Sequence, residues 1–557
     1  MELVIFEENK PFVLEALGNG EFDYMEAASE VFEADFFRFI KARALLDELA
    51  QSYPTPRKKE DVPFWFYVAS NLSMRLHGVH AFDAFPMVVR SGGMLQAFGP
   101  QAGRKVVHPK TGETTILCEG FNRKNLFDRE TPCDPDYLRK VAKDTDAQAL
   151  MRWFGEDGVR VFQRRRVFDR EGVFIGDASY LFVPDNPHYE GSVKLLFDEN
   201  NHPISKEQYR KTTDEQKSRC QWRRCYKMVT LLHTNPTLDF FLFVAVKVVS
   251  GNDHECPVLY ALVKRFVETV GKGVMKRLIL DRGFLDGKAI SLCKKQYGID
   301  ILIPIRSNMD LYVDAMALFQ ESDVEWRECK PPKEEAKESI RLRPKVIAKR
   351  EKKRQEKLRQ VKQQQPPPSP QEVLIKKEAA AIEEFRSWSS CTVPLTVVAN
   401  RESYADGHQE IWFLIDTKEV QDPSQTQQEY HLRTSTEERY RQLKCFNDLT
   451  HFTSRAFSMV VNQVVFIMLA YNLLQLYLLK RGRKELNQKT LPRIRQQLLP
   501  SDNYIIVYYQ NYYGLFRPFE LIGFVVTLRE EPRKKIAAKC RRIGRELNGV
   551  MQNPRPP

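Results

Sequence analysis

The sequence predicts an α/β protein built around a mixed β-sheet, with further segments on both sides of that core. Two observations support this fold class. Residues 166–305 alternate between strand-like and helix-like patterns, as α/β units do. Hydrophobic residues make up 42% of the 557 residues, so the chain can bury a large core. This length corresponds to several domains, or to one domain with large insertions.

Within residues 166–305, short apolar runs predict strands, and apolar residues at helical spacing predict helices. The predicted elements are strands at 173–176, 228–232 and 240–249, a helix at 258–270, a strand at 277–280, a helix at 285–297 and a strand at 301–305. Three strands followed by helix, strand, helix and strand predict a mixed sheet. Further toward the N-terminus, residues 36–88 also have a helical pattern.

The most apolar stretch of the chain is residues 457–479. It contains four amide side chains, Asn462, Gln463, Asn472 and Gln475, which favour a buried helix over a membrane helix. The N-terminal residues are acidic and lack the basic-then-apolar layout of a signal peptide. We therefore expect a cytoplasmic protein that does not associate with membranes.

The net charge of +13 suggests an anionic partner, and nucleic acid is the first candidate. Residues 330–378 hold 16 Lys and Arg against 7 Glu, a net of +9, and include a Pro-rich run. This segment reads equally as a solvated spacer or as an arm that contacts DNA. A second basic cluster, at 533–542, follows a tyrosine-rich stretch. It suits either DNA contacts or a strand pair capped by a basic helix.

Two aspartates, Asp177 and Asp281, follow predicted strands directly. Open α/β sheets bind ligands at such strand ends, although a single aspartate there is more often a turn residue or a helix cap. Five residues could contribute to a zinc site: Cys220, Cys225, His233, His254 and Cys256. Their spacing fits no common zinc motif, so ordinary cysteines are the default interpretation.

A third candidate carboxylate belongs to a predicted helix. Tyr430, Arg433, Glu437 and Lys444 are spaced by 3, 4 and 7 residues, which places them within about 60° of one another on an α-helix. Glu438 lies about 100° away, so the geometry favours Glu437 as the functional carboxylate. Two alternatives stay open: Thr434-Ser435-Thr436 could cap the start of a helix, and the stripe could be a solvated face with ion pairs.

These pieces together resemble a known family. The spacing Tyr-x2-Arg-x3-Glu-x6-Lys resembles the YREK signature of bacterial cut-and-paste insertion-sequence transposases, which are DDE transposases with an RNase H-like core. The contexts GDASYLF around Asp177 and LILDRGFLDG around Asp281 resemble the first and second Asp motifs of that family. The resemblance covers roughly residues 166–480. The charged 330–378 segment departs from it, because the family's insertion is usually more compact.

For the catalytic site, the resemblance implies that Asp177, Asp281 and Glu437 hold two Mg²⁺ or Mn²⁺ ions, with Asp177 bridging both. Hard divalent ions prefer such oxygen ligands. Three carboxylates repel one another without metal, so metal and DNA should bind together.

For DNA, the resemblance implies that Arg433 and Lys444 grip phosphates near the cut and that Tyr430 hydrogen-bonds a phosphate. Trp412 stands where similar transposases keep a tryptophan that stacks on a flipped base. A core position in a β-strand is an equally good interpretation of Trp412. Arg306, just after the strand at 301–305, is a further phosphate candidate.

The expected domain order follows from these assignments: a mostly helical, DNA-end-binding region at 1–165, the first part of an RNase H-like core at 166–310, a β-rich insertion with the charged linker at 311–425, Glu-bearing core helices at 426–480, and a C-terminal DNA-binding or dimerisation region at 481–557. Strands are expected within the insertion at 393–401 and 410–417.

The predicted function is that of a DNA transposase, which cuts at transposon ends and joins the freed 3′-OH to target DNA, with a hairpin as one route of excision. The expected partners are transposon ends, target DNA and a second copy of the chain, in the cytoplasm with the nucleoid. Two alternatives remain open: a transposase-derived DNA-binding protein without strand transfer, and an RNase H-like nuclease.

Overall fold

A computed structural model describes residues 3–4, 7–29, 32–58, 62–85, 103–107, 114–117, 134–238, 240–329, 374–483, 486 and 503–552. The chain forms two compact units. The first comprises residues 1–170, 177–274 and 437–557, and the second comprises residues 171–176 and 275–436. The predicted domain boundaries follow a different division and stay a prediction.

The core has the predicted mixed sheet. The strands β9 (Phe240–Ser250), β8 (Gln221–Asn235), β6 (Val173–Val183), β10 (Arg277–Leu280) and β11 (Asp300–Pro304) follow one another in this order. β8 and β9 pair antiparallel, whereas β10 pairs parallel with β6 and with β11. An antiparallel part followed by two parallel neighbours makes an RNase H-like core. The α/β fold class predicted from the sequence is therefore confirmed.

The helices of this core also lie where the sequence predicts them. α12 (Glu255–Val270) follows β9, and α13 (Gly287–Leu292) follows β10 and continues as a π-helical turn, Cys293–Tyr297. α12 buries one face, because its apolar residues recur at helical spacing. The tightly buried strand β10 consists of an Arg followed by three aliphatic residues, all of them buried.

The first strand differs from the prediction in one respect. Asp177 does not end it, because β6 continues to Val183. The pairing with β10 stops at Gly176, opposite Leu280, and the strand order then continues from β6 to β8. Asp177 therefore lies where one neighbouring strand ends rather than where its own strand ends.

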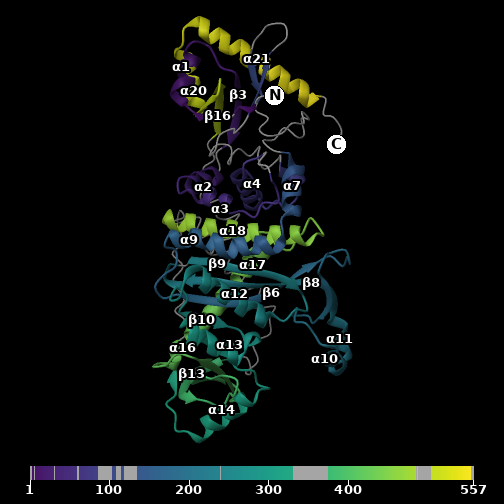
Figure 1. Ribbon diagram of the computed structural model, residues 1–557, viewed down its shortest axis with the longest axis vertical. Helices are drawn as coiled ribbons and strands as arrows, with labels where there is room; N and C mark the ends of the chain where they lie inside the picture. The colour runs from purple at the N-terminus through teal and green to yellow at the C-terminus, as the bar shows by residue number, and fades with distance from the viewer. Residues whose placement is uncertain are drawn as a thin grey trace. The chain divides into compact units, whose positions relative to one another are not determined.

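The apolar stretch predicted as a buried helix is α18 (Phe457–Lys480), which packs against β9, α4 (Phe64–Leu76) and α8 (Ala147–Trp153) (Figure 1). Among the described residues it is the one helix long and apolar enough to span a membrane, but 83% of its apolar window is buried inside the protein.

The amides of α18 explain why this helix belongs to a protein core. Asn472 accepts a hydrogen bond from the backbone N–H of Phe243 and donates one to its carbonyl, at 2.9 and 2.8 Å. Asn462 donates to the Tyr67 hydroxyl, and Gln463 to carbonyls of the preceding loop. Buried amides need such partners, and a protein interior supplies them. The prediction of a buried helix is confirmed.

The helices expected over 36–88 are α2 (Phe32–Lys41), α3 (Leu45–Gln51) and α4. Farther along, α7 (Pro135–Asp144) and α8 pack against α18, and α9 (Val159–Arg164) packs against α12 and α3.

The two terminal regions share one small sheet, which no sequence pattern indicated. β16 (Asn503–Tyr509) and β17 (Tyr512–Phe516) form a hairpin, β3 (Tyr24–Ser29) pairs with β16, and β2 (Glu7–Glu8) pairs with β17. Helices α1 (Lys10–Gly18), α20 (Pro518–Thr527) and α21 (Glu530–Gln552) accompany this sheet. Tyr508 and Tyr513 are buried in it, so the tyrosine-rich stretch is a strand pair followed by a basic helix.

In the second unit, the insertion extends the sheet beyond β11. The strands β12 (Arg327–Glu328), β13 (Leu374–Phe385), β14 (Leu395–Tyr404) and β15 (Gln409–Asp416) are antiparallel, and β15 pairs with β11. α14 (Asp310–Glu321) and α16 (Pro423–Tyr430) belong to the same unit. The expected strands at 393–401 and 410–417 are present as β14 and β15. The charged segment 330–378 lies outside the described residues up to 373, and its last five residues begin β13.

Candidate active site

Asp177 lies on β6 with only 8% of its surface exposed. One of its carboxylate oxygens accepts a hydrogen bond from the backbone N–H of Ala178 at 2.8 Å. Because side chains alternate along a strand, Asp177 and Ser179 point to the same face of the sheet. That face is the one covered by α17 (Thr434–Phe446), since Lys444 of α17 reaches Ser179.

Asp281 directly follows β10 and is half-buried. The sequence left open whether it caps a helix. Its side chain does not cap the short turn Arg282–Phe284, and Asp286 is the residue that caps α13, accepting from the Ala289 N–H at 3.0 Å. Among the described residues the Asp281 carboxylate has no hydrogen-bond or ion-pair partner. A half-buried carboxylate without a partner is available to an external ligand.

Arg306 lies beside the same turn. Its Nε donates to the carbonyl of Arg282 at 2.8 Å, and its Nη2 donates to the carbonyl of Gly283 at 3.4 Å. The guanidinium is otherwise exposed. The structure therefore places the predicted phosphate ligand next to Asp281 in the second unit.

Glu437 stands in the first turn of α17, where the helix dipole favours a negative charge. It is exposed, whereas Thr436 and Tyr440 are buried against the sheet. The Tyr440 hydroxyl lies 2.5 Å from the Thr230 hydroxyl of β8, which fixes the rotation of the helix. Glu438 instead forms an ion pair with Arg441 at 2.7 Å on the outer side.

Lys444 lies two turns after Glu437 on the same side of α17. Its ammonium donates to the Ser179 hydroxyl at 2.7 Å and to the Tyr180 carbonyl at 2.8 Å. Burial lowers the pKa of Lys444 to about 8, although the charge of Asp177 opposes this shift. The first unit therefore brings Asp177, Lys444 and the Glu437-bearing helix together.

The predicted single helical stripe is wrong in part. Tyr430 ends α16, a 3₁₀ turn follows at His431–Arg433, and α17 begins at Thr434. The hydroxyls of Thr434 and Ser435 donate to carbonyls of this turn, and such local bonds favour a helix start. Tyr430 and Arg433 therefore lie before α17, whereas Glu437 and Lys444 share that helix.

Trp412 and Tyr430 lie together in the second unit. Their ring centroids are 6.0 Å apart with the planes tilted by 51°. Trp412 is on β15, paired with Asn400 of β14, and both aromatic residues are only partly buried against the core of the insertion. Both interpretations of Trp412 thus have support, since it packs on the strand's core and keeps an accessible part.

The three carboxylates fall into both units: Asp177 and Glu437 belong to the first and Asp281 to the second. In the described parts of the chain, no three His, Cys, Asp or Glu side chains form a group that could hold a metal ion. This also covers the cysteines considered for zinc. Burial raises the pKa of Cys225 to about 11, which disfavours the thiolate that zinc binds.

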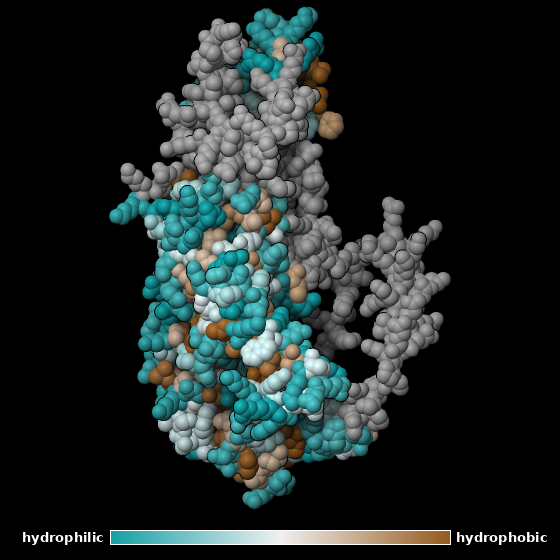
Figure 2. Space-filling view, turned by 90° about the vertical axis from the view of Figure 1, so that its right-hand side faces the viewer, coloured by the Kyte–Doolittle hydropathy of each residue, from teal (hydrophilic) through white to brown (hydrophobic). Residues whose placement is uncertain are grey.

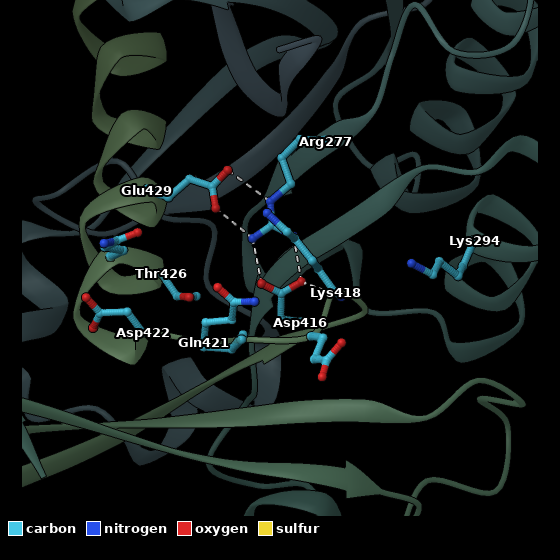
Figure 3. Close-up of a pocket in the computed structure, with 11 residues that line it drawn as sticks. Arg277, Lys294, Asp416, Lys418, Gln421, Asp422, Thr426 and Glu429 are labelled. Atoms are coloured by element: carbon cyan, nitrogen blue, oxygen red, sulfur yellow. Dashed lines mark hydrogen bonds and ion pairs between the residues drawn. The ribbon is translucent and has the colours of Figure 1, made fainter. Parts of the chain in front are cut away.

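A cavity of about 740 Å³ in the second unit is lined by residues that the sequence did not single out. Arg277, the first residue of β10, forms a bidentate ion pair with Asp416 at 2.5 and 2.6 Å and a second ion pair with Glu429 at 2.8 Å (Figure 3). Both carboxylates raise the pKa of Arg277. The only sequence signals were charges at the ends of the apolar runs RLIL and IWFLID.

Comparison with known proteins decides the family. The family described as "Transposase DDE domain" matches residues 183–473, more than half of the chain. This chain belongs to the DDE transposase family. The matched range includes Asp281 and Glu437 and begins six residues after Asp177. Among curated proteins, none is similar enough to count as a match.

Membership fixes the broad activity. The DDE transposase chain acts on DNA, and its family generally uses divalent metal ions. The RNase H-like core described above agrees with this assignment.

Proposed function

We propose that this DDE transposase cuts DNA at transposon ends and joins the freed 3′-OH to target DNA, with Asp177, Asp281 and Glu437 as the metal-binding catalytic residues. The observation that carries this proposal is the register of β6 and β10. Gly176 pairs with Leu280, and each is followed directly by one of the two aspartates. Neighbouring parallel strands are about 4.8 Å apart, which suits two carboxylates that share metal ions.

The environment of Asp281 supports the same assignment. A carboxylate that neither caps a helix nor forms an ion pair among the described residues has no evident structural role. Asp286, five residues later, provides the cap that the local fold needs. The two aspartates of the DRGFLD segment therefore divide function and structure between them.

The third carboxylate is supported by the way α17 is attached. Tyr440 binds β8 and Lys444 binds β6, so the Glu437 side of the helix faces the strand of Asp177. Glu438 points to Arg441 instead. Glu437 is therefore the better candidate on contacts as well as on spacing.

The donor set fits hard divalent ions such as Mg²⁺ or Mn²⁺, because all three side chains offer carboxylate oxygens and no sulfur or imidazole. When bound, two such ions activate the attacking oxygen and neutralise charge at the leaving oxygen. In the first step water attacks the phosphodiester and frees a 3′-OH. In the second step that 3′-OH replaces an oxygen of a target phosphodiester, so one P–O bond forms as another breaks.

The cationic and aromatic residues then position the DNA. Lys444 contributes an ammonium close to Asp177, and Arg306 contributes a guanidinium beside Asp281. Both suit phosphate oxygens near the cut. Arg433 is assigned to phosphate by its place before Glu437. Trp412 and Tyr430 together offer an aromatic surface that suits a base turned out of the duplex.

The finer features of the proposal rest on the resemblance to YREK insertion-sequence transposases. They are cut-and-paste movement with a hairpin as one excision route, two metal ions in each site, and a homodimer that joins two DNA ends near the nucleoid. Recognition of the ends is assigned to the N-terminal helices, and further DNA binding or dimerisation to residues 481–557.

The deciding experiment is cleavage of a labelled duplex that carries the DNA flanking the gene, with Mg²⁺, with Mn²⁺ and without metal. We expect metal-dependent cutting at the end boundary that is lost in Asp177→Asn, Asp281→Asn and Glu437→Gln and retained in Glu438→Gln. Joining is followed with a pre-cut end and a supercoiled target.

Three other outcomes would replace the proposal. Binding without cutting in either metal would indicate a DNA-binding protein. Cutting without joining would indicate a nuclease. Cutting that survives Glu437→Gln but not Glu438→Gln would exclude the assignment of the third carboxylate.

A further inference from the structure

A projecting part of the first unit has no role in the proposed chemistry. Between β6 and the start of β8, residues 184–222 form what we call the arm, which carries β7 (Val193–Phe197), α10 (Lys206–Lys211) and α11 (Asp214–Arg219). Figure 1 shows α10 and α11 at its end, away from β9 and α18. Neither helix has a buried residue, so burial of apolar surface does not explain them.

The arm displays an unusual aromatic residue. Trp222 is 59% exposed, although it lies on a strand and pairs with Leu196 of β7. Tyr226 and Thr230, four and eight residues later on β8, face α18 and α17. Because side chains alternate along a strand, Trp222 points to this same face, which is also the face of Asp177.

Helix α10 carries three exposed cations. Lys206, Arg210 and Lys211 of α10 are exposed and have no ion pair or hydrogen bond from their side chains among the described residues. Other cations of the arm are neutralised: Lys194 by Asp185, Lys217 by Asp214 and Arg219 by Glu199 and Glu215. In Figure 2, where this side faces the viewer, the surface is largely hydrophilic.

The segment that leads into α10 and the strand of Trp222 lie on either side of β7. The N–H of Ile204, two residues before α10, donates to the carbonyl of Leu196 at 2.8 Å, and Leu196 is the partner of Trp222. Two strand spacings of about 4.8 Å each separate Ile204 from the Trp222 backbone, and Lys206 follows two residues after Ile204.

We propose that the arm is a second DNA-binding surface, which holds duplex DNA outside the cut through phosphate contacts from Lys206, Arg210 and Lys211 and packing of Trp222 against a sugar or base. This inference rests on the proposed function, because that function brings DNA to Asp177. β6 leads from Asp177 to the start of the arm. Its residues Asp177 to Val183 span about 20 Å at 3.3 Å per residue. That length corresponds to about six base pairs.

The test compares two duplexes with the same end sequence: a long one, extending about 20 base pairs on both sides of the cut, and a short one, extending about 4. The arm variant is K206Q/R210Q/K211Q. The matched control K264Q/R265Q/K272Q removes three charges on and after α12 of the same unit. Affinity is measured from 50 to 200 mM salt.

For the long duplex, we expect the arm variant to bind about tenfold or more weakly at 200 mM salt, with the slope of log K against log salt reduced by about 3. Binding and cleavage of the short duplex should stay at the wild-type level. In the wild type, the long duplex should change tryptophan fluorescence more than the short duplex does. Trp222→Phe should remove that additional change.

The arm assignment is overturned if the arm variant binds the long duplex with wild-type affinity and slope, or if the α12 control loses as much. A change in assembly mass without a change in DNA affinity would assign the arm to a protein partner instead. These readouts measure binding, so they stay separate from failure of the proposed function, which appears as absent cutting, absent joining, or cutting that survives loss of a proposed catalytic carboxylate.

Discussion

The two ends of strand β10 carry charges in opposite situations. At its start, Arg277 is 5% exposed and bound to Asp416 and Glu429. Just after its end, Asp281 is half-buried, and its carboxylate has no partner among the described residues. Only three aliphatic residues separate these environments. A buried charge that is fully paired contributes to the fold, whereas a carboxylate left unpaired is available for a ligand.

This difference also explains why the cavity beside Arg277 is not the candidate catalytic site. The cavity is lined by charged residues, but its central charges are already paired, because Arg277 binds both Asp416 and Glu429. It lies at the start of β10, whereas Asp281 follows the end of that strand. Charge balance therefore distinguishes the two sites better than cavity size does.

The largest effect is expected from a substitution at the functional end of β10. Asp281→Asn should lower cleavage by about 10³-fold or more, because a metal ligand contributes several kcal/mol to the transition state. The free energy of unfolding without metal should change by less than about 0.5 kcal/mol, since no partner is lost. Cleavage time courses and chemical denaturation measure the two effects.

Asp286→Ala is the matched control for that variant. It removes the cap of α13, so unfolding should cost about 1 kcal/mol less while cleavage persists. If Asp281→Asn destabilises the protein as much as Asp286→Ala does and still cuts DNA, Asp281 has a structural role and not a catalytic one.

The next largest effect is expected from a substitution at the structural end of β10. Arg277→Met leaves Asp416, which is 1% exposed, without its counter-charge, so the free energy of unfolding should fall by about 3–5 kcal/mol. Lys264→Met, in an exposed pair with Glu268, should cost about 0.5 kcal/mol or less. Denaturant titrations measure both variants. An equal loss of unfolding free energy in both variants would show that burial does not make the Arg277 ion pair more important than the exposed pair.

The pH dependence of the same variant sharpens the assignment. Burial raises the pKa of Asp416, and Arg277 opposes that rise in the wild type. Without Arg277 the folded protein should bind a proton on Asp416 at a pH where the unfolded chain does not. The loss in the free energy of unfolding caused by Arg277→Met should therefore become smaller as pH falls from 7 toward 4.

A smaller effect concerns the aromatic pair in the insertion. If Trp412 supports a flipped base, Trp412→Ala should weaken binding of a cut end by about 1–3 kcal/mol, and Trp412→Phe should recover most of it. The pair with Tyr430 is only partly buried, so stability should change less than binding does. Loss of stability with unchanged end binding would assign Trp412 to the core alone.

The order of elements in the core could be predicted from the sequence, because β10, β11 and the first part of β6 are buried and contain short apolar runs. The continuation of β6 past Asp177 could not, since a polar residue within a strand resembles a strand end. The sheet shared by both termini was also hidden, because β3 and β16 are nearly 500 residues apart and neither shows its partner.

At the candidate site, spacing identified Glu437 and Lys444 together because both belong to α17. The single helix expected over 430–444 is interrupted, because Tyr430 ends α16 and a 3₁₀ turn at His431–Arg433 precedes α17. Arg277 was missed because an ion pair between β10 and β15 has no signature within either strand.

The smallest expected effect tests Lys444, which combines features of both ends of β10: it is largely buried, yet its partners are the neutral Ser179 hydroxyl and Tyr180 carbonyl. Its folded-state pKa of about 8 is below the ordinary lysine value of 10.5. The folded state therefore holds fewer protons than the unfolded state between these values, so wild-type stability should rise with pH from about 8 to 10.5.

Lys444→Met should lack that rise and keep roughly the wild-type stability at pH 7, while binding of end DNA weakens several-fold because a phosphate loses its cation. Wild-type binding at low salt should also decline above pH 8 more steeply than that of the variant. A variant with wild-type binding and a parallel pH profile would mean that Lys444 only fastens α17 to β6. The phosphate beside Asp177 would then need another cation.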